Sequence, residues 1–326
     1  MSPILKHLKN DGYHVTVHGS QRVIDVIKNN PNVDKVILHH DDFVEPDKLK
    51  PMWEEISKGY DKFINLCESI EGTLVKVPSR EDFHWSKERR HAECNVNYYD
   101  RTLEVAGYPH VKGENGELYF SSFEESMFQD TMLKDLGRFK ILWCLSGSSA
   151  HKSYPYSEYV AIAFLTKYPD SVIYTVGDTV CELLQWQHPR TRNYADKWGI
   201  RKTLCTTKFV DLVISPDTSV LNAAGCFETP KIALLSSISE ENVTKYFKNC
   251  TNLTGTADCY PCHLLHYNQD ACCVDEITLA AKCMSTITPE QVFNAMEDVY
   301  KKWKGIEDGE NICSNQDISS QLSGQI

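Results

Sequence analysis

Hydrophobic and polar positions alternate between helical and extended periods along the first third of the chain. Ser2-Pro3 ahead of an apolar stretch at 4–8 predicts a short amphipathic helix that ends at Asp11-Gly12. The next elements expected are a strand at 13–18, a helix at 21–29, and strands at 35–39 and 61–67. Strands separated by helical segments indicate parallel strand–helix–strand units, so the pattern predicts an α/β domain.

The same alternation restarts after Gly137. The elements expected there are strands at 139–145, 171–176, 211–215 and 231–235, a helix at 156–167, and a last helix from Ile287 to about Trp303. Before this point we expect a long helical stretch at 85–106 and a loop at 109–122. Two α/β halves predict two Rossmann-like domains that face a central cleft, with ligands bound beyond the carboxyl ends of the strands.

The expected division of the chain follows from this pattern. It comprises an N-terminal domain at 1–135, a C-terminal domain at 136–288 with a cysteine-rich insertion at 250–283, a closing helix at 289–304 and a polar tail at 305–326. An α/β domain normally begins with a strand, whereas this chain begins with a helix. We therefore expect an N-terminal sheet that lacks its usual first strand, either because the numbered chain is a truncated form or because the sheet is built differently.

Composition narrows the class of protein. The 326 residues are 41% apolar and 24% charged, a balance typical of globular proteins and unlike that of disordered or fibrous chains. A formal charge of −11 repels phosphate backbones and anionic lipid, which argues against nucleic-acid and membrane-surface partners. The most apolar stretch, 159–165, is too short to cross a bilayer, and the first residues lack a signal-peptide pattern. These observations predict a cytoplasmic protein.

Two hydroxyl-rich loops follow predicted strands of the second half. The loop from Ser146 to Lys152 offers hydroxyls, free amides and one ammonium, which suit a diphosphate, although it lacks the glycine that precedes the lysine in a phosphate loop. The loop from Asp217 to Asn222 again joins a strand to a helix. The alternative is that the first loop is a plain connection and that Asp217 and Thr218 only cap the next helix.

Cysteines are concentrated near the C-terminal end of the second half. Six of the 13 lie between Cys250 and Cys283, with the spacing Cys259-x2-Cys262-x9-Cys272-Cys273-x9-Cys283. A paired cysteine motif followed by two further cysteines is typical of a closed structural metal site, for which zinc is the usual ion and iron the alternative. Cys259, Cys262, Cys272 and Cys283 are the candidate ligands, while disulfides and free thiols remain open alternatives.

The loops of the second half resemble those of the heptosyltransferase-type glycosyltransferases, family nine, with the GT-B fold. Lys152-Ser-Tyr-Pro155 is similar to a Lys-x-Trp-Pro-like segment of that family, and Gly177-Asp178 with Glu182 to its glycine and acidic residue after the next strand. The family's Asp-Thr-Gly-x-x-His-x-Ala-Ala loop resembles 217–224, followed by the strand entry at 230–234. Upstream, 2–8 and 30–36 are similar to the family's first helix and next strand entry, so nearly the whole chain is covered.

The resemblance implies an inverting glycosyltransferase that moves a heptose or related sugar from a nucleotide-diphosphate donor, with an ADP-sugar favoured, to a saccharide or lipopolysaccharide-type acceptor. It implies no organic cofactor and no metal in the chemistry, an acceptor-side N-terminal domain and a donor-binding C-terminal domain. It also implies that the closing helix at 289–304 crosses back toward the N-terminal domain. The implied donor-binding residues are Ser148, Ser149, Lys152, Gly177, Asp178, Glu182, Asp217, Thr218, Ser219 and Asn222. Ser219 and Asn222 stand where the family has a glycine and a histidine.

The residue for the general base is a separate question. The family's catalytic aspartate lies in a loop after the first strand, which would fall before Met1 here. Glu68 and Glu71 follow the strand predicted at 61–67 and are the carboxylates available to take the acceptor's proton. They are also explained as a solvated helix start. Three nearby arginines could hold an anionic acceptor, or they could form surface ion pairs. They are Arg80, Arg89 and Arg90.

Two other functions fit parts of the pattern. A catalytically silent nucleotide-sugar or glycan-binding protein accounts for the missing base loop and for Asn222. A GT-B glycosyltransferase that acts on a modified nucleic-acid base keeps the chemistry, but the acidic charge argues against it. Release of nucleotide from a sugar donor separates the first alternative from the enzyme.

Overall fold

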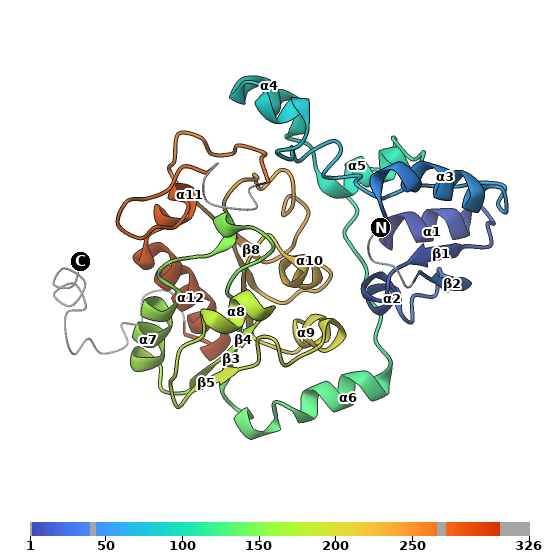
Figure 1. Cartoon of the computed structure of the whole chain (residues 1–326). Coiled ribbons are helices and arrows are strands. Elements are labelled where there is room, and N and C mark those ends of the chain that lie inside the picture. Colours follow the sequence, from blue (N-terminus) through green and yellow to red (C-terminus); the bar gives the residue numbers. More distant parts are fainter. Residues whose placement is uncertain (1, 40–43, 266–271, 307–326) are drawn as a thin grey trace.

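The computed structural model describes residues 2–39, 44–265 and 272–306. The tail predicted at 305–326 lies outside these residues except for its first two positions, and Cys313 lies outside with it. Two α/β parts are visible in Figure 1, a smaller N-terminal part drawn in blue and a larger C-terminal part drawn from green to red. None of the helices within the described ranges combines the length and the apolar composition that crossing a bilayer requires.

A two-stranded parallel sheet forms the centre of the N-terminal part. Its elements are α1 (Ser2–Asn10), β1 (Thr16–Gly19), α2 (Gln21–Ile27), β2 (Lys35–Leu38), α3 (Pro46–Ser57), the 3-10 helix η1 (Glu81–His84), α4 (Lys87–Cys94) and α5 (Tyr98–Val105). Val17 of β1 lies opposite Val36 of β2. Leu5 from α1 and Ile27 from α2 pack with Val17 into one small core, while Ile4 packs on α5 in another.

A six-stranded parallel sheet forms the C-terminal part. The chain reaches it through α6 (Ser122–Asp130) and η2 (Leu133–Asp135), and continues with β3 (Phe139–Cys144), η3 (Ala150–Lys152), α7 (Ser157–Lys167), β4 (Ser171–Val176), α8 (Thr179–Leu183), β5 (Thr191–Asn193), α9 (Ile200–Thr206), β6 (Leu212–Pro216), α10 (Ser219–Gly225), β7 (Lys231–Leu235), β8 (Cys250–Thr254), α11 (Lys282–Ser285) and α12 (Pro289–Lys304). The strand order is β5-β4-β3-β6-β7-β8. The four central strands are almost fully buried, as expected where helices cover both faces of a parallel sheet.

The predicted α/β class and two Rossmann-like halves agree with this architecture. The strands expected at 171–176 and 231–235 are found as β4 and β7 with these bounds, and 139–145 and 211–215 as β3 and β6 within one residue at each end. The edge strands β5 and β8 were not predicted. Because β8 is the last strand of the sheet, the segment predicted as an insertion at 250–283 begins with a structural strand.

Two predicted elements differ from the structure, and one helix of the N-terminal part was not predicted. The helix expected at 85–106 is two helices, α4 and α5, because the Asn97 side chain caps the start of α5 by accepting from the amides of Tyr99 and Asp100. The strand expected at 61–67 is not formed, because this segment has no neighbouring strand among the described residues. The helix α3 was not predicted.

The closing helix α12 packs on the C-terminal sheet. The GT-B resemblance led us to expect that it crosses back toward the N-terminal domain. Val292, Met296 and Tyr300 face the core formed by Phe139 of β3 and Phe164 of α7. These apolar residues recur at helical spacing and form a stripe along one side of α12. The stripe is buried against the apolar core of the C-terminal part.

One buried ion pair joins the two parts beside α6. Arg201 of α9 donates from Nε to Glu124 Oε1 at 2.9 Å and from Nη2 to Glu124 Oε2 at 3.1 Å. The same guanidinium donates to the backbone carbonyls of Asp25 in α2, at 3.0 Å, and Tyr119, at 2.5 Å. Both side chains are only about a tenth exposed, at 13% and 10%. Arg201 thereby fixes α9 of the C-terminal part to α2 of the N-terminal part.

This ion pair predicts a pH dependence of stability. The hydrogen bonds from Arg201, followed by those within the Ser121 capping box, lower the pKa of Glu124 to about 2, from 4.5 in an unfolded chain. A pKa that is lower in the folded than in the unfolded state stabilises the fold at pH values above the unfolded-state pKa. The contribution of Glu124 to stability is therefore present above about pH 4.5 and is lost as the pH falls toward 2. Urea unfolding from pH 6 to pH 2.5 should lose about 3 kcal/mol through this group. The Glu124→Gln variant should be less stable at pH 6 and should show a shallower decline, and an unchanged decline would contradict the assignment.

Candidate active site

The two hydroxyl-rich loops meet beyond the carboxyl ends of the neighbouring strands β3 and β6. Lys152 Nζ donates to the backbone carbonyl of Asp217 at 2.6 Å and lies 3.5 Å from Asp217 Oδ2. Gly147 lies where the two loops approach each other. A Cβ at this position would lie 2.9 Å from Lys152 Cδ and 3.0 Å from Thr218 Cγ2. The sequence-predicted lysine and aspartate therefore lie in contact, and the loops that carry them pack closely beside Gly147.

Hydroxyl groups surround this contact. Ser146 and Ser153 share a hydrogen bond of 2.7 Å, and Thr218 is bonded to Ser215 at 2.9 Å while it caps α10. The Ser149 hydroxyl is buried and has no hydrogen-bond partner among the described residues. Leaving a buried hydroxyl unpaired costs free energy, so Ser149 is a donor available to a ligand. Ser148 is exposed beside it.

A third loop follows β4, the strand next to β3. Gly177 has φ of +136°, and a Cβ there would lie 2.2 Å from the Cys181 sulfur, so only glycine fits. Asp178 is exposed, and its carboxylate accepts from the amides of Val180 and Cys181 at the start of α8. Glu182 is exposed on α8. The structure thus gives Asp178 a capping role and forms no polar contact between these two carboxylates and the Lys152–Asp217 pair.

The N-terminal part reaches the second loop through α5. Tyr99 donates from its hydroxyl to Asn222 Oδ1 at 3.3 Å, and Asn222 donates to the Thr218 carbonyl at 2.9 Å. Asn222 stands at the family's histidine position, and its carbonyl oxygen is taken up by this tyrosine. Ser219, at the family's glycine position, is exposed at the start of α10. Nothing in the sequence around Tyr99 indicated the contact, because it depends on how the two parts are placed.

The two candidate bases differ in their surroundings. Burial, followed by the negative charges of Asp217 and Glu71, raises the pKa of the Tyr98 phenol well above its ordinary value. Tyr98 and Glu71 of the N-terminal part therefore lie within electrostatic range of each other, and Tyr98 within range of the donor loop. Glu68 instead pairs with Arg80 Nη2 at 2.6 Å on an exposed surface and has φ of +59°. Glu71 is exposed as well, so what distinguishes it from Glu68 is its electrostatic effect on Tyr98.

The remaining candidate arginines are engaged by the protein. Arg80 also donates to the Glu71 carbonyl at 3.0 Å, and the Arg89 guanidinium stacks 3.8 Å above the Trp85 ring. Arg90 donates to the Cys262 carbonyl at 2.8 Å. These contacts favour the ion-pair and packing interpretation of all three arginines over an anion site.

The predicted metal ligands gather on one side of the C-terminal core. Burial raises the pKa of Cys259 to about 11 and of Cys272 to about 12, and the nearby thiols contribute to both shifts. Cys259, Cys272 and Cys283 are free thiols. Among the described residues, no group of three or more His, Cys, Asp or Glu side chains is placed so that it could hold a metal ion. Cys283, with Cys259 and Cys272 against it, packs in the apolar core instead, so the predicted metal site is not formed by these side-chain positions.

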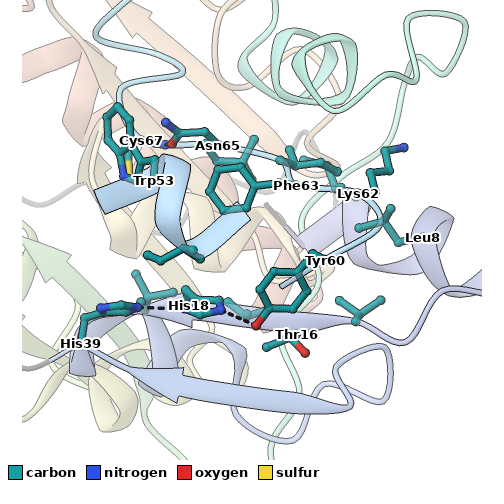
Figure 2. Close-up of a pocket in the computed structure, with 18 of the residues that line it drawn as sticks. Leu8, Thr16, His18, His39, Trp53, Tyr60, Lys62, Phe63, Asn65 and Cys67 are labelled. Carbon is teal, nitrogen blue, oxygen red and sulfur yellow. Dashed lines mark hydrogen bonds between the residues drawn. The ribbon is translucent and has the colours of Figure 1, made fainter. Parts of the chain in front are cut away.

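A cavity of about 540 Å³ lies in the N-terminal part. Figure 2 shows His18 of β1 at its floor, bonded on one side to His39 and on the other to the Tyr60 hydroxyl. Burial, followed by the charges of His39 and Lys35, lowers the pKa of His18. Helices α1 and α3 and the segment at 62–67 supply the remaining walls. No pattern in the sequence indicated this cavity, which is distinct from the loop contact described above.

Comparison with solved structures identifies the fold. No protein-family model matches the sequence, and no curated protein matches it significantly. A glycosyl transferase family 9 structure from Veillonella parvula matches with a TM-score of 0.64 at 15% identity, over 92% of this chain and 93% of that chain. The ADP-heptose lps heptosyltransferase II of E. coli matches with a TM-score of 0.62 at 13% identity, over 93% and 95%.

A third solved structure, the bacterial iron-containing dodecameric glycosyltransferase TibC from enterotoxigenic E. coli, matches with a TM-score of 0.58 at 13% identity, over 92% of this chain and 72% of that chain. All three alignments cover more than nine-tenths of this chain and therefore extend over both α/β parts. Together with the parallel sheets, they show that this chain has the two-domain GT-B fold found in family 9 glycosyltransferases and heptosyltransferases.

Proposed function

We propose that this protein is an inverting glycosyltransferase that transfers a heptose or related sugar from a nucleotide-diphosphate donor to a saccharide or lipopolysaccharide-type acceptor. The observation that carries the proposal is the contact between Lys152 and the Asp217 loop at the carboxyl edge of the sheet. Ligands of parallel sheets bind at this edge. The likeness to the ADP-heptose transferase of E. coli supports ADP as the nucleotide.

Diphosphate binding follows from the groups at this contact. Among the described residues, Lys152 supplies the one ammonium that has a polar contact with Asp217. Only 13% of the Lys152 side chain is exposed. A donor diphosphate offers more negative charge than the Asp217 carboxylate, so it would draw the ammonium toward itself while the lysine keeps its bond to the backbone carbonyl. The unpaired Ser149 hydroxyl supplies a neutral donor. Both groups stabilise the charge that develops on the leaving nucleotide.

Proton removal from the acceptor is assigned to Glu71. An inverting displacement needs a carboxylate on the face of the sugar opposite the leaving group. Glu71 comes from the N-terminal part, across from the donor loop, and lies in electrostatic range of Tyr98. The N-terminal domain then binds the acceptor, in agreement with its place in the resemblance. This reaction requires no organic cofactor, and we propose that it proceeds in the cytoplasm without a metal ion.

Turnover tests the proposal directly. The intact chain is incubated with ADP-heptose and a lipopolysaccharide-type acceptor, and release of ADP is followed. A thermal-shift series over ADP-, UDP-, GDP- and CMP-sugars selects the donor, since a ligand at 100 times its Kd adds about 2.7 kcal/mol. Stabilisation by a donor without nucleotide release with any acceptor would overturn the enzyme and leave the sugar-nucleotide binding protein. Salt-dependent binding to DNA would instead favour a nucleic-acid acceptor.

Replacing Glu71 by glutamine separates the two candidate bases. We expect kcat to fall about 100-fold in Glu71→Gln, because general-base catalysis contributes at least this factor, whereas donor affinity stays the same. Glu68→Gln is the matched control, since Glu68 lies on the same segment but pairs with Arg80. Steady-state rates of both variants, with Kd for ADP from calorimetry, check the assignment. Equal rates for the two variants would remove Glu71 from the mechanism.

A structural zinc or iron ion is proposed for Cys259, Cys262, Cys272 and Cys283. Burial raises the pKa of these thiols and so disfavours the thiolates that a metal ion needs. Metal binding therefore requires the side chains to turn out of the apolar core and to lose their protons to solvent as the ion binds. We expect one ion per chain near pH 8, lost on acidification and in the Cys259→Ser variant but retained in the Cys67→Ser control. Elemental analysis of the purified chain checks this, and metal-free protein of full stability would refute it.

A further inference from the structure

Two buried thiols lie next to the two hydroxyl-rich loops, 146–152 and 217–222. Cys144 is the last residue of β3, opposite Val176 at the end of β4. The chain leaves β4 through α8, which carries Cys181. Both cysteines are buried, and neither thiol has a part in the proposed sugar transfer.

A glycine lies beside both sulfurs. A Cβ at Gly177 would lie 2.2 Å from the Cys181 sulfur and 3.8 Å from the Cys144 sulfur, so glycine leaves the space that the Cys181 sulfur fills. The Cys181 thiol donates a hydrogen bond to Cys144, and this contact lowers the pKa of Cys144 although burial opposes it. The same contact, followed by burial, raises the pKa of Cys181. The pair therefore consists of one thiol that ionises more readily than an ordinary cysteine and a second thiol in contact with it.

Cys144 also contacts both hydroxyl-rich loops. Its thiol donates to the Ser146 carbonyl at 3.2 Å, in the loop that carries Ser149 and Lys152. The Thr218 hydroxyl, which caps α10, donates to the same sulfur at 3.7 Å. A chemical change at this one sulfur therefore alters a contact of each loop.

We propose that Cys144 and Cys181 form a reversible disulfide in the presence of hydrogen peroxide, and that this bond loosens the two loops from Cys144. The Cys144 thiolate attacks one oxygen of the peroxide and becomes a sulfenic acid, while the hydroxide released takes up the proton that Cys144 gave to solvent. The Cys181 sulfur then attacks the sulfenic sulfur, an S–S bond replaces the S–O bond, and the hydroxyl leaves with the Cys181 proton as water. The two sulfurs lose the electron pair that the peroxide gains.

The surface position of α8 gives the oxidant access to the pair. Cys181 is the buried residue of this five-residue helix, whereas Val180 is 49% and Leu183 82% exposed. A segment with so few buried contacts opens locally at small cost in free energy. Hydrogen peroxide is little larger than water, so a small displacement of α8 admits it.

Oxidation changes the contacts of both loops. A disulfide sulfur carries no proton, so the Ser146 carbonyl loses its donor. It also accepts more weakly than a thiolate does, so the contact from Thr218 weakens as well. The loop at 146–152 is then less restrained, and its Ser149 and Lys152 are less well placed for a diphosphate. This last effect rests on the proposed function.

Peptide mapping of the full-length chain tests the disulfide. The protein is treated with hydrogen peroxide, unfolded in urea with iodoacetamide to block free thiols, and digested with trypsin without reductant. Trypsin places Cys144 in 141–152 and Cys181 in 168–190, each as the one cysteine of its peptide. We expect the two peptides in one species that is two hydrogen atoms lighter than their sum, and we expect dithiothreitol to separate them.

Other cysteines of the chain provide the controls. Cys205 of α9 is fully buried, and its pKa is raised by burial with Glu125, instead of a thiol, as the next contributor. Its peptide, 203–208, should carry the iodoacetamide label after the same treatment. The Cys181→Ser variant should give no linked species, whereas Cys67→Ser, at an exposed position, should give as much as the wild type. If Cys181→Ser fails to fold, the wild-type map and Cys205 carry the comparison.

Hydrogen exchange on the oxidised and reduced wild type tests the loosening of the loops. Amides of 146–152 should exchange several-fold faster after oxidation and return to the original rate with dithiothreitol. Calorimetry with ADP measures the consequence for the donor. The Kd of ADP should rise about tenfold on oxidation, the effect of losing about one hydrogen bond.

Three results would overturn the proposal. They are peptides 141–152 and 168–190 that stay separate after peroxide, a disulfide that joins either cysteine to another thiol, and a Cys144–Cys181 disulfide that leaves exchange of the 146–152 amides unchanged. Failure of the reduced chain to bind ADP would contradict the proposed donor site and not the disulfide, since neither the peptide map nor hydrogen exchange uses a nucleotide.

Discussion

Replacing Lys152 by methionine should lower kcat/KM for the sugar donor about 1000-fold. The ammonium is held beside Asp217, and its removal takes away the positive charge that stabilises the leaving diphosphate. Methionine preserves the length and apolar stem of the side chain, so the fold should lose no more than about 1 kcal/mol of stability. Nucleotide release and the thermal shift given by ADP alone measure catalysis and binding separately, and both should collapse in this variant.

A matched lysine provides the control for this prediction. Lys248 pairs with Glu228 on the surface, where both side chains are 70% exposed, and Lys248→Met removes the same charge from the molecule. Its kcat/KM should stay within twofold of the wild type. Lys152→Arg should recover part of the activity, because it restores the charge with a different geometry. Near-wild-type turnover in Lys152→Met would exclude the Lys152–Asp217 contact as the diphosphate site.

Replacing Arg201 by methionine should destabilise the protein by about 3–5 kcal/mol. Removing one partner of a buried ion pair leaves the other charge without compensation, and Glu124 keeps only Lys28, at 3.5 Å, as a cationic neighbour. The two carbonyls that Arg201 bonds, on Asp25 and Tyr119, also lose their donor. Urea unfolding at pH 7 measures the loss, and Arg22→Met, an exposed arginine of α2, should change stability by less than about 0.5 kcal/mol.

A double variant distinguishes charge from packing at this position. Arg201→Met with Glu124→Gln removes both charges, so it should be more stable than Arg201→Met alone. The effect of the second substitution then has the opposite sign from its effect in the wild type. Additive losses would show that the guanidinium acts through its carbonyl contacts and its stacking 4.3 Å from the Phe120 ring instead of through the carboxylate.

The strands that could be predicted from sequence are the buried ones. β3, β4, β6 and β7 read as continuous apolar runs because both of their faces are covered by helices. β8 (Cys250–Thr254) and the three-residue β5 lie at the edges of the sheet, are only partly buried and carry no such run. Residues 61–67 show the converse, since an apolar pattern forms a strand only when a neighbour supplies hydrogen bonds.

The candidate site was predictable where it depends on neighbouring strands. Lys152 and Asp217 follow β3 and β6, which pair directly, so their loops had to emerge at the same edge. The contact between Tyr99 and Asn222 joins the two domains, and no local pattern encodes it. Nor could periodicity reveal that Cys283 turns into the apolar core, since spacing alone is the same for a metal ligand and for a buried thiol.

The fully buried Asn242 has a mechanical consequence. Its side-chain amide donates to the backbone carbonyls of Cys94 and Val96, at 2.8 and 2.9 Å, in the segment between α4 and α5. Its backbone carbonyl accepts from the amide of Tyr98. Arg201, Tyr99 and Arg90 attach the halves at further points on other elements. Because these attachments do not all lie on one line, a rotation of one half about a single axis would have to break at least one of them.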